Sequence, residues 1–209
     1  MLEFFYKHRL EIFSLTLEHL WLVGVAIAIA VAVGVPLGIL VSRTAWLRKP
    51  VLGSANVLQT IPSLALFGFL LPAPWLGERA DRLAIVALVL YALLPIVRNT
   101  YTGIMGIEPA VKEAALGMGM TDSELLTQVE LPLGAPVILA GVRIATVTAV
   151  GVATIAAAIG AGGLGELIFR GVAMVNNQLI LAGALPAALL AIAADVALGA
   201  LETRFRVPK

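Results

Sequence analysis

Long runs without a charged residue constrain this chain more than any other feature of its sequence. Residues 20–41 and 51–74 contain no Asp, Glu, Lys or Arg. A helix of about 20 apolar residues crosses a hydrocarbon core roughly 30 Å thick. Further apolar runs complete the pattern. Membrane-spanning helices are expected at about 20–41, 51–74 with an interruption at Pro62, from 83 to beyond 98, from after 132 to about 159, and 179–201.

The overall composition agrees with a membrane protein. Hydrophobic residues make up 60% of the chain and charged residues 13%, whereas soluble domains carry about 25% charged residues. A soluble helical protein is therefore disfavoured. We expect an all-α integral membrane protein with about five transmembrane helices and a single transmembrane domain over residues 1–209.

The same composition argues against several kinds of site. A net charge of +1 offers no basic surface for nucleic acid. The absence of cysteine removes disulfides, thiolate zinc sites and cysteine nucleophiles together. The two histidines, His8 and His19, both lie near the N-terminus. A histidine-based metal site is disfavoured, and no bound metal is expected.

Residues 1–18 form an N-terminal segment of mixed character. Charges of both signs interrupt it, and no short apolar run leads to a small-residue cleavage site, so a signal peptide is not indicated. Leu2, Phe5, Ile12 and Phe13 lie among these charges. This pattern is typical of an amphipathic helix at a membrane interface. A leading extension of the first span explains it equally well.

The polar stretch at residues 108–132 separates the third and fourth apolar runs. Pro109 suits the first position of a helix, where its missing N–H has no intrahelical partner. Gly117 and Gly119 offer places for that helix to stop. Thr121 followed by Glu124 fits a capping box that starts a second helix.

Pro132 is expected to end that second helix before the chain re-enters the membrane. The stretch therefore predicts two short helices joined at a glycine turn and standing out of the membrane. Local chemistry alone leaves open whether they bind a partner or serve as an amphipathic connector.

The spacing within this stretch resembles the cytoplasmic coupling loop of ABC importer permeases. The family pattern is Glu-Ala-Ala, three residues, Gly, nine residues, Ile, any residue, then Leu-Pro. This sequence departs from it only in having Val129 in place of the Ile. The resemblance implies the type I importer permease fold and contact with a separate ATPase chain. The residues expected to couple to the ATPase are Glu113, Ala114, Ala115, Gly117, Gly119, Leu131 and Pro132.

Other segments resemble the osmoprotectant branch of these permeases. They are residues 59–66, 91–104, 159–165 and 167–171, spread over most of residues 20–201. The resemblance implies import of glycine betaine, choline, carnitine or a related quaternary ammonium solute. Methionine permeases share the five-span layout and a similar Gly-rich segment, so a methionine or other small-solute importer is the nearest alternative.

The resemblance also implies partners. No lysine follows a glycine, as a Walker phosphate loop would require. ATP and Mg²⁺ are therefore expected on the separate ATPase chain, with no cofactor and no catalytic residue on this one. We also expect an extracytoplasmic solute-binding protein and a second permease subunit, either identical or a similar paralogue.

Charge distribution gives the expected orientation in the cytoplasmic (inner) membrane. If the coupling loop is cytoplasmic, nine Lys and Arg residues lie inside and five outside, together all 14 in the chain. This agrees with the positive-inside rule. It places the N-terminus outside and the C-terminus inside. Arg98, within the third run, is expected to extend its side chain toward the interface.

Uncharged polar residues within the runs are candidates for the translocation path. Packing between helices explains each of them as well as a path does, but proline frees backbone carbonyls and favours the path near Pro62. The Gly-rich segment is either a gate or a flexible turn, and the resemblance favours the gate. The path or gate candidates are Gln59, Thr60, Pro62, Ser63, Asn99, Gly160, Gly162, Gly163 and Gly165.

Asp195 is the one acid inside a predicted span. A structural partner to a polar group, a gate element and a proton relay all explain such an acid, and the structural role is favoured. An ion-coupled secondary transporter would need Asp195 as its ion site and would leave the loop unexplained. A membrane enzyme would need clustered His, Asp or Glu within the spans. Glu166 and Arg170, four residues apart, are expected to pair.

Overall fold

The computed structural model describes residues 2–75 and 78–205, and helices account for nearly all of them. The described elements are α1 (Leu2–Lys7), α2 (Arg9–Arg43), α3 (Ala45–Thr60), α4 (Ser63–Leu70), α5 (Ala80–Met105), α6 (Pro109–Gly117), α7 (Asp122–Glu124), the π-helix η1 (Leu125–Glu130), α8 (Leu131–Ala156), the 3₁₀-helix η2 (Ala157–Ile159), α9 (Gly165–Ala173) and α10 (Asn177–Arg204). No strand occurs among these residues.

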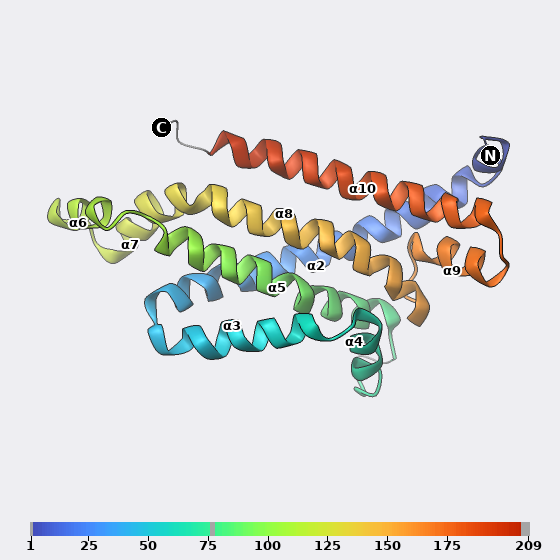
Figure 1. The fold of residues 1–209 in the computed structure, drawn as a ribbon, viewed down its shortest axis with the longest axis horizontal. Coiled ribbons are helices and arrows are strands. Elements are labelled where there is room, and N and C mark those ends of the chain that lie inside the picture. Colours follow the sequence, from blue (N-terminus) through green and yellow to red (C-terminus); the bar gives the residue numbers. More distant parts are fainter. Residues whose placement is uncertain (1, 76–77, 206–209) are drawn as a thin grey trace.

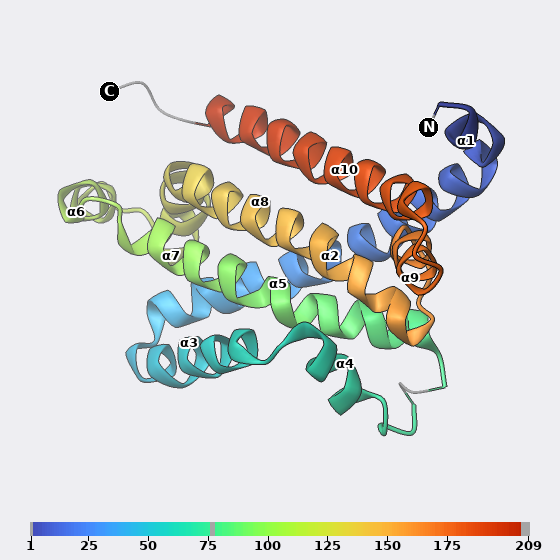
Figure 2. The same ribbon diagram turned by 45° about the vertical axis from the view of Figure 1, so that its right-hand side comes forward.

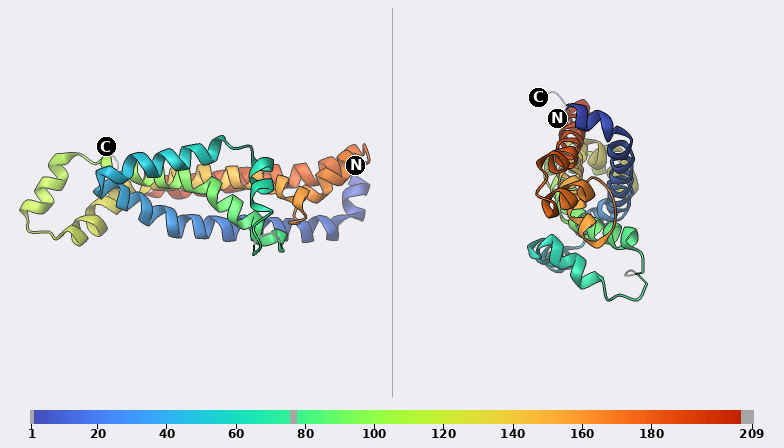
Figure 3. Two further views of the ribbon diagram at one scale, coloured as in Figure 1. Left: turned by 90° about the horizontal axis from the view of Figure 1, so that it is seen from below. Right: turned by 90° about the vertical axis from the view of Figure 1, so that its right-hand side faces the viewer.

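Four long helices form the body of the molecule. α5 packs against α2 and α8, and α8 also packs against α10 (Figure 1). α3 lies along α5. In Figure 2, α6 lies beyond one end of this bundle, while α1 and α9 lie at the other end. Figure 3 shows the segment with α6 and α7 projecting past the long helices. The chain therefore has one end built from the predicted coupling loop and an opposite end that holds the Gly-rich segment.

The prediction of an all-α protein with about five spans is confirmed. Four helical stretches are long and apolar enough to cross a membrane: 9–43, 80–105, 122–159 and 177–204. A fifth crossing needs α3 and α4 together, which meet at a bend of 103°. The first, third, fourth and fifth predicted runs therefore fall on single stretches, and the second is broken.

The break in the second run lies at Ile61 and Pro62, whose backbones are extended. Proline disfavours a helical conformation for the residue before it and has no N–H to continue a helix. α5 covers the freed backbone here: the Tyr91 hydroxyl donates to the Ile61 carbonyl. The Gln59 Nε2 donates in return to the Tyr91 carbonyl at 3.0 Å. The broken helix is thus held by two side chain–backbone hydrogen bonds.

Small residues set the distance between α2 and its neighbours. Ala26, Ala30, Gly34 and Gly38 recur every four residues on α2, and all are buried. Residues four apart lie on one face of a helix, and small ones let two helices approach closely. The core beside this face includes Phe67 of α4 and residues of α5 and α8. α2 itself runs from Arg9 without a break, so residues 9–18 are the first turns of the helix that carries the first span.

Candidate functional site

The polar loop at residues 108–132 contains the glycine turn expected from the sequence. Pro109 is the first residue of α6, and α6 ends at Gly117. Gly119 has a φ of +89°, in the left-handed region that a residue without Cβ adopts most easily. The Met120 N–H donates to the Ala115 carbonyl at 3.2 Å, which closes the turn.

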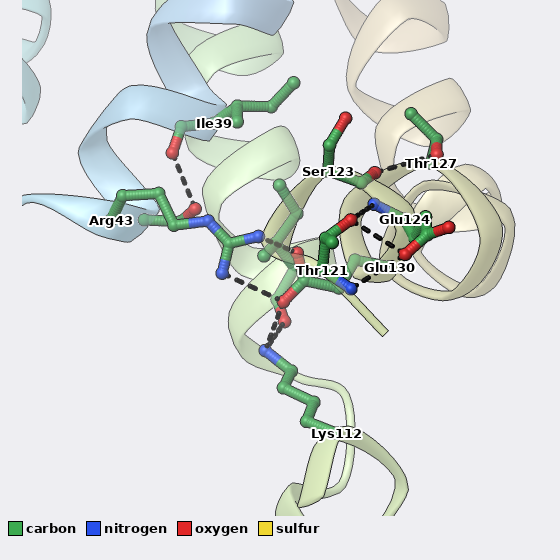
Figure 4. Close-up of polar contacts among 10 residues, drawn as sticks. Ile39, Arg43, Lys112, Thr121, Ser123, Glu124, Thr127 and Glu130 are labelled. Carbon is green, nitrogen blue, oxygen red and sulfur yellow. Dashed lines mark hydrogen bonds and ion pairs between the residues drawn. The ribbon is translucent and has the colours of Figure 1, made fainter. Parts of the chain in front are cut away.

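The turn leads into the capping box predicted from Thr121 and Glu124, and that prediction is confirmed. The Glu124 N–H donates to the Thr121 Oγ1 at 3.3 Å, and the Thr121 N–H donates to the Glu124 Oε2 at 2.8 Å. Figure 4 shows both contacts at the start of α7. Each side chain satisfies a backbone donor that a helix start leaves without a partner.

The expected helix end at Pro132 is wrong. α7, η1 and α8 follow one another directly, so helical structure continues from Asp122 to Ala156. The π-helical turn ends with the Leu131 N–H donating to the Leu126 carbonyl, five residues back. Pro132 comes just after this wide turn, at the second residue of α8. Because the first residues of a regular helical segment need no N–H partner within it, proline is tolerated there.

Exposure divides the residues expected to contact an ATPase. Glu113, Ala114, Gly117, Gly119 and Pro132 are exposed, while Leu131 is half-buried. Ala115 is buried, with 3% of its surface exposed. Most of the predicted coupling residues therefore present an open surface at the projecting end of the molecule, and Ala115 attaches α6 to the rest of the loop.

Glu130 is the residue on which this end of the molecule converges, and it was not singled out from the sequence. Its side chain is fully buried. The Arg43 guanidinium, at the end of α2, donates to both of its oxygens, with Nη1 at 3.3 Å from Oε1. The Lys112 Nζ, on α6, lies 3.1 Å from Oε1. Figure 4 shows both cations on the one carboxylate.

Lys112 also reaches the last turns of α5. Its Nζ donates to the Ile104 carbonyl at 2.8 Å. Residues of α2, α5, α6 and η1 thus meet within one polar cluster, which we call the Glu130 cluster: Glu130, Arg43, Lys112 and the Ile104 carbonyl. The available signal in the sequence was an acid at the start of the fourth apolar run, with Arg43 just after the end of the first run and Lys112 near the start of the polar stretch.

Burial makes this cluster energetically demanding. Breaking a buried ion pair by removing one partner typically costs about 3–5 kcal/mol. The cost is lower here because the Arg43 side chain is 40% exposed and that of Lys112 is 22% exposed. The buried carboxylate nonetheless needs cations beside it, so the positions of α2, α6 and η1 depend on one another.

The Gly-rich segment lies at the opposite end of the bundle, against α2. Gly160, Gly162 and Gly163 all have positive φ. The Gly163 N–H donates to the Glu18 Oε2 at 3.2 Å. A Cβ on Gly163 would lie 3.1 Å from the His19 Nδ1, so the segment fits closely on α2. Gly165 opens α9 against α8, where a Cβ would lie 1.9 Å from the Thr154 carbonyl oxygen.

Two of the path candidates share the wall of a cavity of about 400 Å³ between α3, α5 and α8. Its lining includes Gln59, Tyr91, Arg98, Asn99, Ile144 and Thr148. Thr60, Pro62 and Ser63 do not line this cavity, and the Thr60 hydroxyl donates within its own helix to the Val57 carbonyl at 2.7 Å. The structure therefore brings Gln59 and Asn99 together and adds Arg98, which the sequence had suggested only as an interface residue.

Asp195 lies beside a cation of the neighbouring helix. The Arg143 Nε donates to its Oδ1 at 2.6 Å, and the Arg143 Nη2 donates to its Oδ2 at 2.7 Å. The Glu202 carboxylate lies 3.6 Å from the Arg143 Nη1. Arg170 pairs with Glu11 of α2 at 2.6 Å rather than with the expected Glu166. In residues 2–75 and 78–205, no three His, Asp or Glu side chains are grouped so as to hold a metal ion.

Most of the chain matches a known protein family. Residues 30–207 match the family described as "Binding-protein-dependent transport system inner membrane component".

Curated relatives share both the length and much of the sequence. Osmoprotectant import permease protein OsmW of Salmonella typhimurium is 48% identical over 90% of this chain and 89% of its own. Carnitine transport permease protein OpuCB of Listeria monocytogenes is 42% identical over 96% and 91%. Choline transport system permease protein OpuBB of Bacillus subtilis is 41% identical over 93% and 88%.

Solved structures with a similar fold are also transporter subunits. A chain from the inward-facing MetNI methionine ABC transporter aligns with a TM-score of 0.81, at 23% identity, over 91% of this chain and 94% of that one. A chain from an amino acid ABC transporter with histidines aligns with a TM-score of 0.76, at 19% identity, over 95% and 96%. At these identities the likeness shows the fold alone, which is that of type I ABC importer permeases.

Proposed function

The chain belongs to the family of binding-protein-dependent transport system inner membrane components, and on that premise we propose that it carries glycine betaine, choline, carnitine or a related quaternary ammonium osmoprotectant through the membrane. The observation that carries this proposal is the identity of 41–48% with permeases named for osmoprotectant, carnitine and choline transport, over nearly the whole of both chains.

An importer built on this chain needs other subunits. Members of the family work with an ATPase and a solute-binding protein. We infer that ATP and Mg²⁺ bind to the ATPase, that the binding protein is extracytoplasmic, and that a second permease subunit, identical or similar, completes the path. The chain then lies in the cytoplasmic membrane with the α6–α7 end inside and α1 and α9 outside.

The projecting loop gives this importer its coupling surface. ATP binding closes the ATPase pair and moves α6, whose exposed residues include Glu113 and Ala114. The spans follow, the path opens toward the docked binding protein, and it reopens inward after hydrolysis. The Gly162–Gly163 turn on α2 lies at the outer end in this arrangement, where a gate would close the path to the outside.

The cavity between α3, α5 and α8 suits the transit of a methylated ammonium solute. Its wall combines the Tyr91 ring, amide and hydroxyl groups and the Arg98 guanidinium, which can meet the carboxylate of glycine betaine or carnitine, and no carboxylate is among its lining residues in the described part of the chain. Methyl groups lose little hydration on entry, whereas a free amine must find hydrogen-bond acceptors or lose a few kcal/mol. The cavity therefore favours a quaternary ammonium over methionine.

Competition in proteoliposomes tests this proposal. The chain is reconstituted with its ATPase and binding protein, and ATP-dependent uptake of radiolabelled glycine betaine and choline is measured with and without excess methionine. Uptake of a quaternary ammonium solute that resists methionine is expected. Strong inhibition by methionine, with no uptake of any quaternary amine, would move the chain to the methionine importers. Uptake by this chain alone on an ion gradient would overturn the ATP-driven assignment.

A further inference from the structure

We propose that Glu130 is a positioning residue through which movement of the coupling loop reaches the first span. The proposal rests on the proposed function, in which α6 contacts an ATPase. In this view the Glu130 cluster is the mechanical link between the loop and the bundle. Neither the loop spacing nor the family match assigns a role to Glu130, Arg43 or Lys112.

The first argument is how little else holds α6. Along Pro109–Gly117 only Ala115 is buried, and Lys112 is the one residue of intermediate exposure. A nine-residue helix with so little buried surface is weakly fixed by apolar packing, because the stabilisation from burial scales with the area removed from water. The Lys112 contacts with Glu130 and with the Ile104 carbonyl therefore carry much of its attachment.

The second argument is that one carboxylate serves both sides of the link. Arg43 stands at the end of α2 and Lys112 stands on α6, and they meet at the same buried Glu130. A displacement of α6 that carries Lys112 away leaves Glu130 with less compensating charge, which raises the cost of its burial. Glu130 and Arg43 then follow the movement, because separation would cost more than a shared shift.

The third argument is the backbone that carries Glu130. It is the last residue of the π-helix η1, where the chain passes from the loop into α8. π-helical turns are rare, appear mostly as single turns inside α-helices, and occur frequently at functional sites. Glu130 therefore lies where the loop passes into α8. Its contacts with Arg43 and Lys112 then help to set the orientation of the loop relative to this helix.

The experiment measures the amount of solute imported per ATP hydrolysed by the full importer, reconstituted with its ATPase and binding protein. Lys112→Met cuts the loop side of the link, Arg43→Met cuts the span side, and Glu130→Gln removes the shared charge. Allosteric coupling between sites typically corresponds to about 5- to 150-fold effects. We expect the solute imported per ATP hydrolysed to fall at least about fivefold in each variant, with ATPase association retained.

Two controls distinguish a role in coupling from a role in stability alone. Lys112→Arg keeps the charge and is expected to retain coupling. Glu11→Gln breaks the ion pair with Arg170 at the opposite end of the bundle and is expected to leave the solute-to-ATP ratio unchanged. Because the two contacts act in series, the Lys112→Met, Arg43→Met double variant should be no worse than the poorer single variant, unlike independent sites, whose effects add.

An unchanged solute-to-ATP ratio in both Lys112→Met and Arg43→Met would overturn the proposal. The proposal would also fail if the losses in the solute-to-ATP ratio add in the double variant and are proportional to the loss of thermal stability in each variant. Should Glu130→Gln fail to insert, the two partner variants still decide, because their side chains are partly exposed. Absence of any ATP-dependent uptake by the unmodified importer would instead refute the proposed function, which is a different result.

Discussion

Arg143 and Asp195 join α8 to α10 through a two-pronged contact across 52 positions of sequence. A guanidinium and a carboxylate match in this geometry, which fixes the relative orientation of two helices as well as their distance. Within a span, each charge would be costly without the other. The contact therefore gives the one acid of the fifth predicted run a structural partner.

A structural role for Asp195 predicts transport without it. Asp195→Asn should lower the thermal midpoint of the purified subunit and leave ATP-driven uptake close to that of the unmodified importer, since no ion has to pass through this carboxylate. The measurements are thermal unfolding in detergent and uptake in proteoliposomes. The exchange Arg143→Asp with Asp195→Arg, which restores the pair in reverse, should recover only part of the stability, because Glu202 then loses its Arg143 partner. Complete loss of uptake in Asp195→Asn at normal stability would favour a relay instead.

Gly119 is predicted to be required for its backbone conformation and not because a side chain at this position would clash with a neighbour. A Cβ there would meet nothing within 4 Å, but the left-handed conformation costs a residue with a Cβ about 1–2 kcal/mol. Loop integrity and uptake should therefore decline in the order Gly, Asn, Ala and Val at this position, because Asn tolerates that conformation better than Ala and a β-branched residue tolerates it least.

Gly117→Ala is the matched control for the Gly119 series. Gly117 is exposed, lies at the end of α6 without a positive φ, and has open space around it. Alanine there should leave the stability of α6 unchanged or slightly raised. Although Gly117 belongs to the predicted coupling surface, a single Cβ without backbone strain should disturb ATPase contact less than alanine at 119 does. Association with the ATPase by co-purification and uptake in proteoliposomes are the readouts. Equal effects of alanine at 117 and 119 would contradict the backbone argument. A further loss of ATPase association in Gly119→Trp would show that the partner surface leaves no space for a large side chain there.

The Glu18 contact with the Gly163 N–H is predicted to hold the Gly-rich segment closed on α2. Glu18→Leu removes the acceptor, and hydrogen bonds to charged groups contribute about 1.5–3 kcal/mol when well shielded. Because Glu18 is exposed, we expect only about a threefold rise in ATP-independent leak of preloaded solute. Glu18→Gln keeps an acceptor oxygen and should leak less than Glu18→Leu. Identical leak in the two variants would indicate that this hydrogen bond does not hold a gate.

Much of this arrangement could be predicted because its signals are local. The capping box of Thr121 and Glu124 involves residues three apart, and the helix break at Pro62 follows from one residue type. The Arg143–Asp195 contact and the Glu130 cluster could not be predicted in this way. α2 and α10 are apolar almost all round, so periodicity does not say which side faces a neighbour. Which charges meet then depends on helix rotation, which only packing decides.

Pro132 shows a second limit of local signals. Proline within a regular helix interior costs about 3 kcal/mol or more, so a helix end was the natural expectation. The π-helical turn of Leu125–Glu130 places Pro132 at the start of a new regular segment, where its missing N–H is harmless. No pattern in residues 125–130 indicates such a turn, and helical structure runs from the loop into the span without interruption.

Arg98 is predicted to distinguish solutes that carry a carboxylate from those that do not. It lines the cavity that contains Gln59 and Asn99, and among the described residues no carboxylate lies within ion-pair distance of it. Glycine betaine and carnitine bring a carboxylate that this guanidinium attracts, whereas choline has a cation and a neutral hydroxyl group but no carboxylate.

Losing a charge-assisted hydrogen bond should lower glycine betaine uptake about tenfold in Arg98→Gln, with choline uptake unchanged or raised. The assay uses a binding protein that delivers both solutes, held at saturation, so that only passage through the permease differs. Arg98→Lys keeps the charge and should retain the preference in part. Thr148→Val alters the same cavity wall without touching its charge, and it should affect both solutes alike. Equal losses of glycine betaine and choline uptake in Arg98→Gln would show that the guanidinium stabilises the cavity and does not discriminate between solutes.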